Sequence, residues 1–167
     1  MAIRTTTTDY TNRKKDISIL QYPNPSIPDA QLVNPSFSKG GRFCTGIQKT
    51  IQKYVIILLT NLNSQEKYPQ FGTTLFSDLI YRSSGLDTIL ASQLFVLASA
   101  KAVSTIKTYQ IYRNDIPADE RLVSVNLINI TFQDIEIGNR KQRNIGFNLK
   151  IQTEAGEVVD YVLPLPK

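Results

Sequence analysis

The stretch QEKYPQFGTTLFSDLIY, residues 65–81, predicts a rigid corner that ends one helix and starts the next. Pro69 fixes its own φ and pushes Tyr68 into an extended conformation. Gly72 can adopt backbone angles that are closed to other residues, or let another segment approach closely. Phe71 stands between Pro69 and Gly72, so we expect its ring to lie between the helices that meet here. The plainer alternative is an ordinary helix–loop–helix corner with no further role.

The residues after this corner have the spacing of a short helix. Leu75, Phe76, Leu79 and Ile80 recur at helical intervals, and Thr73 is a candidate N-cap residue ahead of them. We therefore expect a second, short helix to follow the corner directly.

Two longer helices are expected on either side of the corner. Residues 45–62 gather apolar side chains on one face, and Thr45 is placed to cap the start of that helix. Residues 86–112 form the longest predicted helix, and its alanines would allow another helix to approach closely. We expect Phe71 to be buried between these two helices and Gly72 to be required by the backbone there.

The last third of the chain changes to the periodicity of strands. Residues 122–132 are rich in β-branched and bulky side chains, and residues 144–152 alternate strictly between apolar and polar. Residues 158–163 form a third strand, which we expect Pro164-Leu165-Pro166 to stop. The predicted fold class is α+β, with an N-terminal helical layer packed on a C-terminal three-stranded antiparallel β-meander.

The beginning of the chain predicts an extended arm. Residues 1–40 contain repeated prolines that interrupt any helix, and only residues 17–22 resemble a strand. A loop of this length is either disordered or lies on a neighbouring chain. We therefore divide the chain into a Pro-rich arm, residues 1–40, and a single wedge-like α+β domain, residues 41–167.

The composition indicates a folded protein of one domain. The chain has 167 residues, of which 41% are hydrophobic and 20% are charged. Its net charge of +5 is scattered and accompanies no nucleic-acid motif. The single cysteine, Cys44, excludes an internal disulfide and fits a reducing compartment. We expect no signal peptide and no membrane partner, because the longest apolar run, residues 55–59, is too short to span a bilayer.

The sequence contains few residues of the types that carry out catalysis or bind metal ions. The absence of histidine removes histidine general bases, Ser-His-Asp and Cys-His catalysis, and His-based metal sites. Paired carboxylates stay open in principle, and the candidates are Glu66, Asp78, Asp119, Glu120, Asp134 and Glu136. Their spacing selects no pair, so we expect no enzyme activity, no catalytic residue, no metal and no cofactor.

Several short sequence words resemble one protein family. They are IQKTIQ at residues 47–52, LLT at residues 58–60, PQFGTTL at residues 69–75 and, after the long helix, DERL at residues 119–122. Their order over residues 43–163 resembles the baseplate wedge and sheath-initiator family of contractile phage tails and related injection machines. That family has a Glu-Pro-Arg word before its strand, where this chain keeps the acid and the arginine but replaces the proline with glutamate.

The resemblance implies a structural subunit of the virion, assembled in the host cytoplasm and present in several copies around the tail axis. The partners it implies are other baseplate subunits, the tail sheath protein and, as a further candidate, the tail tube. C-terminal strands in this family look like those of the sheath subunit and template the first sheath ring by strand exchange. Some members carry a lysozyme-like label, which we do not transfer because no catalytic pair stands out.

Three places in the chain are expected to carry this role. The residues are Pro69, Phe71 and Gly72 in the corner, Asp119 and Arg121 before the first long strand, and Val158, Tyr161 and Leu163 in the last strand. We expect Arg121 to pair with a carboxylate or with backbone carbonyls at a subunit contact; the plain alternative is a solvated arginine.

The last strand is expected to join a sheet completed by a neighbouring subunit. Residues 158–163 are β-prone and terminal, and no following helix is there to cover their free edge. The blander outcome is that this strand only finishes the chain's own meander.

Two other classes of function stay open. One is a different non-enzymatic tail or connector protein, such as a tail-terminator or tube-side component, which copy number and position in a particle would distinguish. The other is a cell-wall hydrolase using two carboxylates, which a turbidity assay on purified cell wall would reveal.

Overall fold

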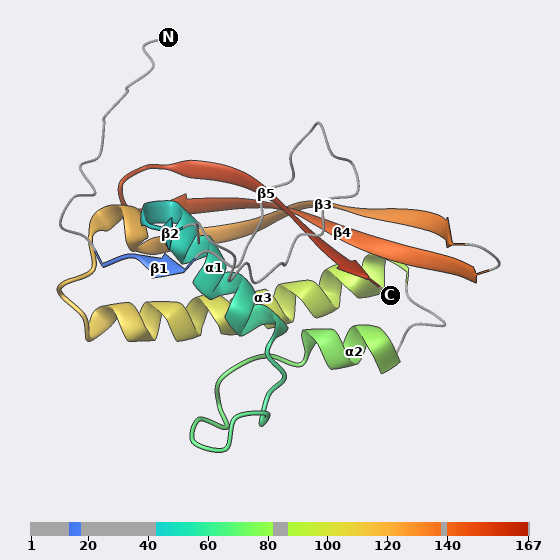
Figure 1. The fold of residues 1–167 in the computed structure, drawn as a ribbon, viewed down its shortest axis with the longest axis horizontal. Helices are drawn as coiled ribbons and strands as arrows, with labels where there is room; N and C mark the ends of the chain where they lie inside the picture. The colour runs from blue at the N-terminus through green and yellow to red at the C-terminus, as the bar shows by residue number, and fades with distance from the viewer. Residues whose placement is uncertain (1–13, 18–42, 82–86, 138–139, 167) are drawn as a thin grey trace, which may run out of the picture.

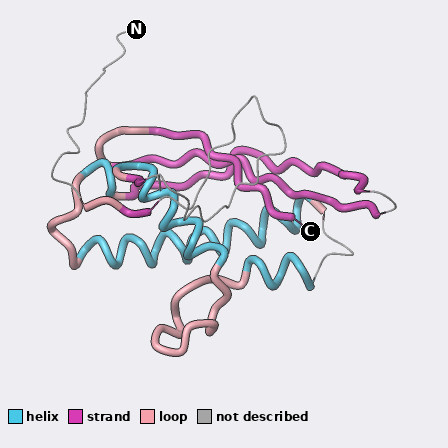
Figure 2. Tube along the Cα trace, in the orientation of Figure 1, coloured by secondary structure: helices cyan, strands magenta, loops and turns pink. Residues whose placement is uncertain are grey.

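The fold is α+β, as the sequence predicts. The structure, a computed structural model, describes residues 14–17, 43–81, 87–137 and 140–166. Helices precede a three-stranded antiparallel sheet along the chain (Figure 1). The helices lie along one side of this sheet, and the segment between the first two helices projects away from it (Figure 2).

The three α-helices lie close to their predicted positions. They are α1 at Gly46–Leu59, α2 at Leu75–Tyr81 and α3 at Thr88–Ile111. Thr45 occupies the N-cap position of α1 but makes no side-chain cap hydrogen bond. Asp87 does cap α3, because its carboxylate accepts a hydrogen bond from the Leu90 N–H at 2.7 Å. Residues 82–86, between α2 and α3, lie outside the described residues.

The main sheet has the strand order β3-β4-β5, with β4 in the centre. The strands are β3 at Leu122–Ile137, β4 at Arg140–Thr153 and β5 at Val158–Pro166. The prediction that Pro164-Leu165-Pro166 stops the last strand was wrong, because Pro164 pairs with Gly146 and Pro166 with Asn144. Proline is tolerated here because β5 is an edge strand and its free side needs no N–H.

The core lies between α3, α1 and the inner face of the sheet. The strict alternation in β4 puts Ile145, Phe147, Leu149 and Ile151 on this face, and all four are buried. The Phe95 ring of α3 stacks on Phe147 with ring centroids 4.7 Å apart. This contact fixes the longest helix against the central strand.

A second, smaller sheet attaches the described part of the N-terminal arm. Strand β1, Asp16–Ile17, pairs antiparallel with β2, Phe43–Cys44. The Gln52 amide of α1 donates to the Ile17 carbonyl at 2.9 Å. The rest of the arm predicted for residues 1–40 lies outside the described residues, so that prediction stays untested there.

Helix α3 has apolar residues on nearly every side. By length and composition alone it is the one helix among the described residues that could cross a membrane. A third of its most apolar window is buried inside the protein. Several other apolar residues of α3 are exposed, including Ile89, Val96, Leu97 and Ile111.

Candidate interaction site

The corner between α1 and α2 is a closed loop that depends on Gly72. The Thr73 N–H donates to the Thr60 carbonyl at 2.8 Å, and the Leu62 N–H donates to the Thr73 carbonyl at 2.9 Å. Gly72 has a φ of +102°, and a Cβ atom at this position would clash with the Thr60 carbonyl oxygen. Both expected reasons for this glycine are present: a left-handed backbone and a close approach.

Phe71 lies between α1 and α3 as expected, but it is only partly buried. It packs against the core and faces Ile57 of α1 and Ile106 of α3 across a hollow. The burial that the sequence predicts is incomplete, because the ring forms one wall of this hollow. Pro69 is exposed, and its carbonyl accepts from the Asn63 N–H at 3.0 Å.

Thr73 links α1 to the start of α2. Its hydroxyl donates to the Leu58 carbonyl at 2.6 Å and accepts from the Leu75 N–H at 3.2 Å. The predicted N-cap position was off by one residue, because Thr74 precedes α2 and its carbonyl accepts from the Asp78 N–H at 2.8 Å. The Thr73 hydroxyl nevertheless satisfies the Leu75 N–H and a carbonyl near the C-terminal end of α1.

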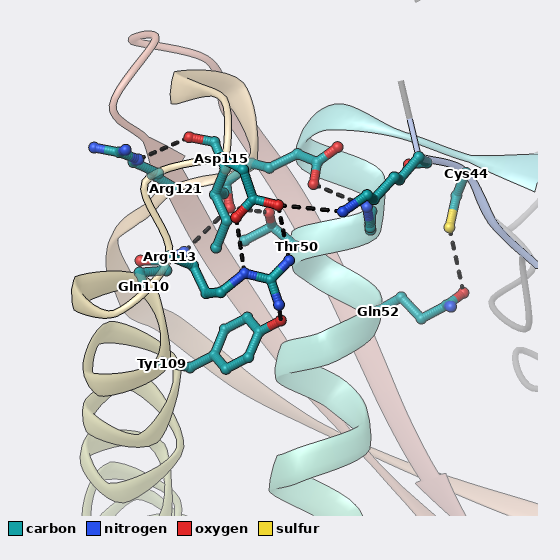
Figure 3. Close-up of polar contacts among 12 residues, drawn as sticks. Cys44, Thr50, Gln52, Tyr109, Gln110, Arg113, Asp115 and Arg121 are labelled. Atoms are coloured by element: carbon teal, nitrogen blue, oxygen red, sulfur yellow. Dashed lines mark hydrogen bonds and ion pairs between the residues drawn. The ribbon is translucent and has the colours of Figure 1, made fainter. Parts of the chain in front are cut away.

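The Asp119-Glu120-Arg121 word forms a short 3₁₀ turn, Ala118–Glu120, before β3. The Arg121 Nε donates to the Ile116 carbonyl at 2.9 Å, and its guanidinium lies 3.5 Å from the Glu154 carboxylate (Figure 3). Arg121 thus pairs with a carbonyl and a carboxylate of its own chain, whereas its predicted place at a subunit contact stays untested. Asp119 is buried in the turn.

The same turn is attached to the hairpin that starts β5. The Glu154 N–H donates to the Arg121 carbonyl at 3.0 Å, and the Ala155 N–H donates to the Ala118 carbonyl at 3.2 Å. These bonds join the Ala118–Arg121 segment, which leads into β3, to the β4–β5 turn. The two regions that the sequence singled out separately are therefore one structural unit.

Glu120 belongs to a buried ion pair that the sequence did not predict. Its Oε2 lies 3.0 Å from the Lys49 Nζ, with the two side chains only 6% and 10% exposed. Its backbone carbonyl accepts from the Thr50 hydroxyl at 2.7 Å and from the Gln110 amide at 3.1 Å. Glu120 therefore anchors the turn to α1 and α3.

An exposed ion-pair network lies beside this anchor. The Arg113 guanidinium donates two hydrogen bonds to Asp115, at 2.7 and 2.8 Å, and Lys14 donates a third at 3.2 Å (Figure 3). The hydrogen bonds from Arg113, and to a smaller extent the one from Lys14, hold the pKa of the Asp115 carboxyl well below its usual range. Arg113 also donates to the Tyr109 hydroxyl at 2.9 Å.

Cys44 is buried, and its thiol lies 3.7 Å from the Gln52 side-chain oxygen. Burial, followed by the nearby Asp16 carboxylate, raises the pKa of the Cys44 thiol. A raised pKa disfavours the thiolate, which is the reactive form of cysteine. Cys44 therefore has the surroundings of a packing residue of β2, as the sequence predicts.

The three site residues predicted in β5 face opposite sides of the sheet. Tyr161 and Leu163 are buried in the core, at 3% and 1% exposure, whereas Val158 is 46% exposed. Two of these side chains therefore support the fold and are not offered to a partner. What β5 offers to another chain is its backbone.

The backbone N–H and C=O groups of β5 point alternately toward β4 and away from it. The Thr153 N–H donates to the Glu157 carbonyl at 3.0 Å, which makes this pair a hydrogen-bonded one. In an antiparallel ladder the hydrogen-bonded pairs recur at every second residue. The backbone groups of Val158, Asp160 and Val162 therefore point away from β4, and among the described strands only β4 pairs with β5.

The prolines of β5 obey the same alternation. Pro164 and Pro166 have the parity of the outward residues, so their missing N–H groups fall on the free side and leave the ladder with β4 intact. The free edge thus offers both donors and acceptors over residues 158–162, and acceptors alone beyond them. Proline at an edge is a common device against uncontrolled strand pairing.

The described residues contain no group of three or more His, Cys, Asp or Glu side chains that could hold a metal ion. Comparisons of the chain with protein-family models, curated proteins and solved structures find no match.

Proposed function

We propose that this protein is a structural subunit of a contractile phage-tail baseplate, a wedge component that templates the first ring of tail sheath through β5. The proposal combines the sequence resemblance over residues 43–163 with one structural observation, the free edge of β5. Its partners would be other baseplate subunits, the sheath protein and, as a further candidate, the tail tube. The protein would be located in the virion, in several copies around the tail axis.

The free edge has the chemistry that strand addition requires. Three residues, Val158, Asp160 and Val162, each turn an N–H and a C=O outward. A partner strand could form about six backbone hydrogen bonds there, worth roughly 3–9 kcal/mol together before the costs of association. Repetition around a ring would add this energy at every copy and so define where sheath polymerisation begins.

The two prolines that follow the free edge, Pro164 and Pro166, limit the register in which a partner strand can pair with it. Because Pro164 and Pro166 lack donors, a full ladder can form only along residues 158–162. The bonds that tie residues 154–155 to the Ala118–Glu120 turn fix where this segment starts. A short template held in place at one end would give an incoming strand a single register.

A pair of proline substitutions tests the proposal. Asp160→Pro removes an outward N–H and leaves the ladder with β4 intact, so it should change the free energy of unfolding by less than about 1 kcal/mol. Val159→Pro, its matched control, removes an inward N–H and should cost about 3 kcal/mol or more. Deletion of all of β5 would be a poorer test, because it also removes Tyr161 and Leu163 from the core.

The readout is electron microscopy of tails assembled with each variant. With Asp160→Pro we expect baseplates that carry this subunit but no sheath. Sheath of normal length on those baseplates would refute the templating role. Absence of the subunit from purified tails made with the unsubstituted chain would refute the baseplate assignment itself.

A further inference from the structure

An apolar hollow of about 380 Å³ lies between α1 and α3. The hollow is lined by apolar and aromatic side chains from three segments: Ile56 and Ile57 of α1, Ile106 and Tyr109 of α3, and Phe71 of the corner. Ile56 and Tyr109 are 37% and 47% exposed, so apolar surface is open to solvent here. The volume is in the range of sites that accept large side chains or small ligands.

A second hollow of about 610 Å³ adjoins the first, and Phe71 and Thr105 line both. Its other walls include Tyr68 and Lys67 of the corner and Lys101 of α3. The two hollows together form an elongated depression, which we call the α1–α3 groove. Residues 67–71 of the α1–α2 segment supply one of its walls.

Three lysine side chains line this groove, and no carboxylate forms an ion pair with them among the described residues. Lys53 lines the first hollow, and Lys67 and Lys101 line the second. Among the described residues, none of the ion pairs involves any of the three. Lys53 instead lies 5.7 Å from the centre of the Tyr109 ring, and its burial lowers the pKa of its ammonium group.

The carboxylates near Lys53 are engaged elsewhere or offset by other cations. Glu120 pairs with Lys49. The charges of Lys49 and Arg113 act on Lys53 in the direction opposite to those of Asp16 and Glu120. The groove therefore keeps an excess of positive charge beside an apolar floor.

We propose that the α1–α3 groove binds an acidic amphipathic helix of a neighbouring protein chain. Apolar side chains on one face of that helix would fill the hollow beside Phe71, and its carboxylates would pair with Lys53, Lys67 and Lys101. A nucleic acid would match the charge but would leave the apolar walls unfilled. This surface is separate from the free edge of β5, so the inference does not depend on the proposed function.

The test selects peptides from a displayed library of random 16-residue sequences on the immobilised full chain. We expect enriched sequences to combine Asp or Glu with apolar residues three or four positions apart. A synthetic peptide of the strongest sequence is then measured by fluorescence anisotropy. Lys53→Gln and Lys101→Gln should each weaken its binding about tenfold.

Matched variants distinguish this groove from general surface attraction. Lys150→Gln changes an exposed lysine of β4 and should leave the affinity within about twofold. Ile56→Asp should abolish binding, whereas Ile128→Asp, at an exposed position of β3, should not. If Lys53→Gln lowers the melting temperature, Lys67→Gln serves in its place, because Lys67 is exposed.

Three results would overturn the inference. Enriched peptides without acidic residues would exclude the charge pairing. Equal weakening by Lys150→Gln and Lys101→Gln would exclude the groove as the site. Displacement of the peptide by single-stranded DNA or by anionic vesicles at equal concentration would favour a different class of partner.

Discussion

The buried ion pair between Lys49 and Glu120 leads to a quantitative prediction for stability. Its charged atoms are 3.0 Å apart, and both side chains are at least nine-tenths buried. Replacing Glu120 with Gln keeps the side-chain shape and the backbone carbonyl that accepts from Thr50. Among the described residues, the Lys49 ammonium would then have neutral acceptors in place of the carboxylate: the substituted amide oxygen and the Lys14 carbonyl at 3.0 Å.

The expected loss follows from leaving a buried charge uncompensated. Removing one partner of a buried ion pair costs about 3–5 kcal/mol. For a chain of 167 residues, each kcal/mol lowers the melting temperature by about 2–4 °C, so Glu120→Gln should lower it by roughly 6–20 °C. Adding Lys49→Met, which removes the stranded charge, should restore part of this loss.

The assay is urea denaturation followed by far-ultraviolet circular dichroism, because the chain has no tryptophan. Glu154→Gln is the control, since its ion pair with Arg121 is 3.5 Å long and about half exposed. That control should change the free energy of unfolding by less than about 1 kcal/mol. Equal small losses from Glu120→Gln and Glu154→Gln would refute the assignment of Glu120 as the anchor of this turn.

Three further predictions concern the corner and the thiol. Gly72→Ala should cost more than about 1–3 kcal/mol, because strain at positive φ adds to a clash with Thr60, and a melting temperature equal to the native one would contradict this. Phe71→Ala should cost about 1–3 kcal/mol, below the cost of a fully buried phenylalanine, and a urea midpoint unchanged from the native chain would exclude its packing role. Burial raises the pKa of Cys44 above its ordinary 9.0, so the neutral thiol stabilises the fold below that pH, and this stability is lost as the pH rises through the higher folded pKa. Cys44→Ala should therefore lose less stability than the native chain between about pH 8 and pH 10, and parallel pH profiles would count against it.

Local patterns predicted the elements of the fold well. The strict alternation over Ile145–Ile151 identified both a strand and its buried face, since a side-chain period of two can be satisfied only on a pleated surface. Gly72 was identified because proline, aromatic and glycine fall together at a helix junction. In both cases the physical cause lies within a few neighbouring residues, where a sequence can be interpreted directly.

Contacts between distant segments could not be predicted in this way. Nothing local connects Lys49 with Glu120, and the bonds from residues 154–155 to the Ala118–Glu120 turn depend on the complete fold. The rule that proline ends a strand failed at Pro164 because it ignores which side of an edge strand lacks a partner. Phe71 was expected to be buried, and it is only partly so, because the spacing of residues cannot reveal the hollow beside its ring.

The exchange of individual backbone amides in β5 tests the central claim, the free edge, most directly. In the isolated chain, the amides of Asp160 and Val162 should exchange quickly, whereas those of Val159 and Tyr161, which face β4, should be protected. On assembly into tails, the Asp160 and Val162 amides should become protected as well. Protection of all four amides in the isolated chain, or continued fast exchange of Asp160 and Val162 in assembled tails, would contradict the account.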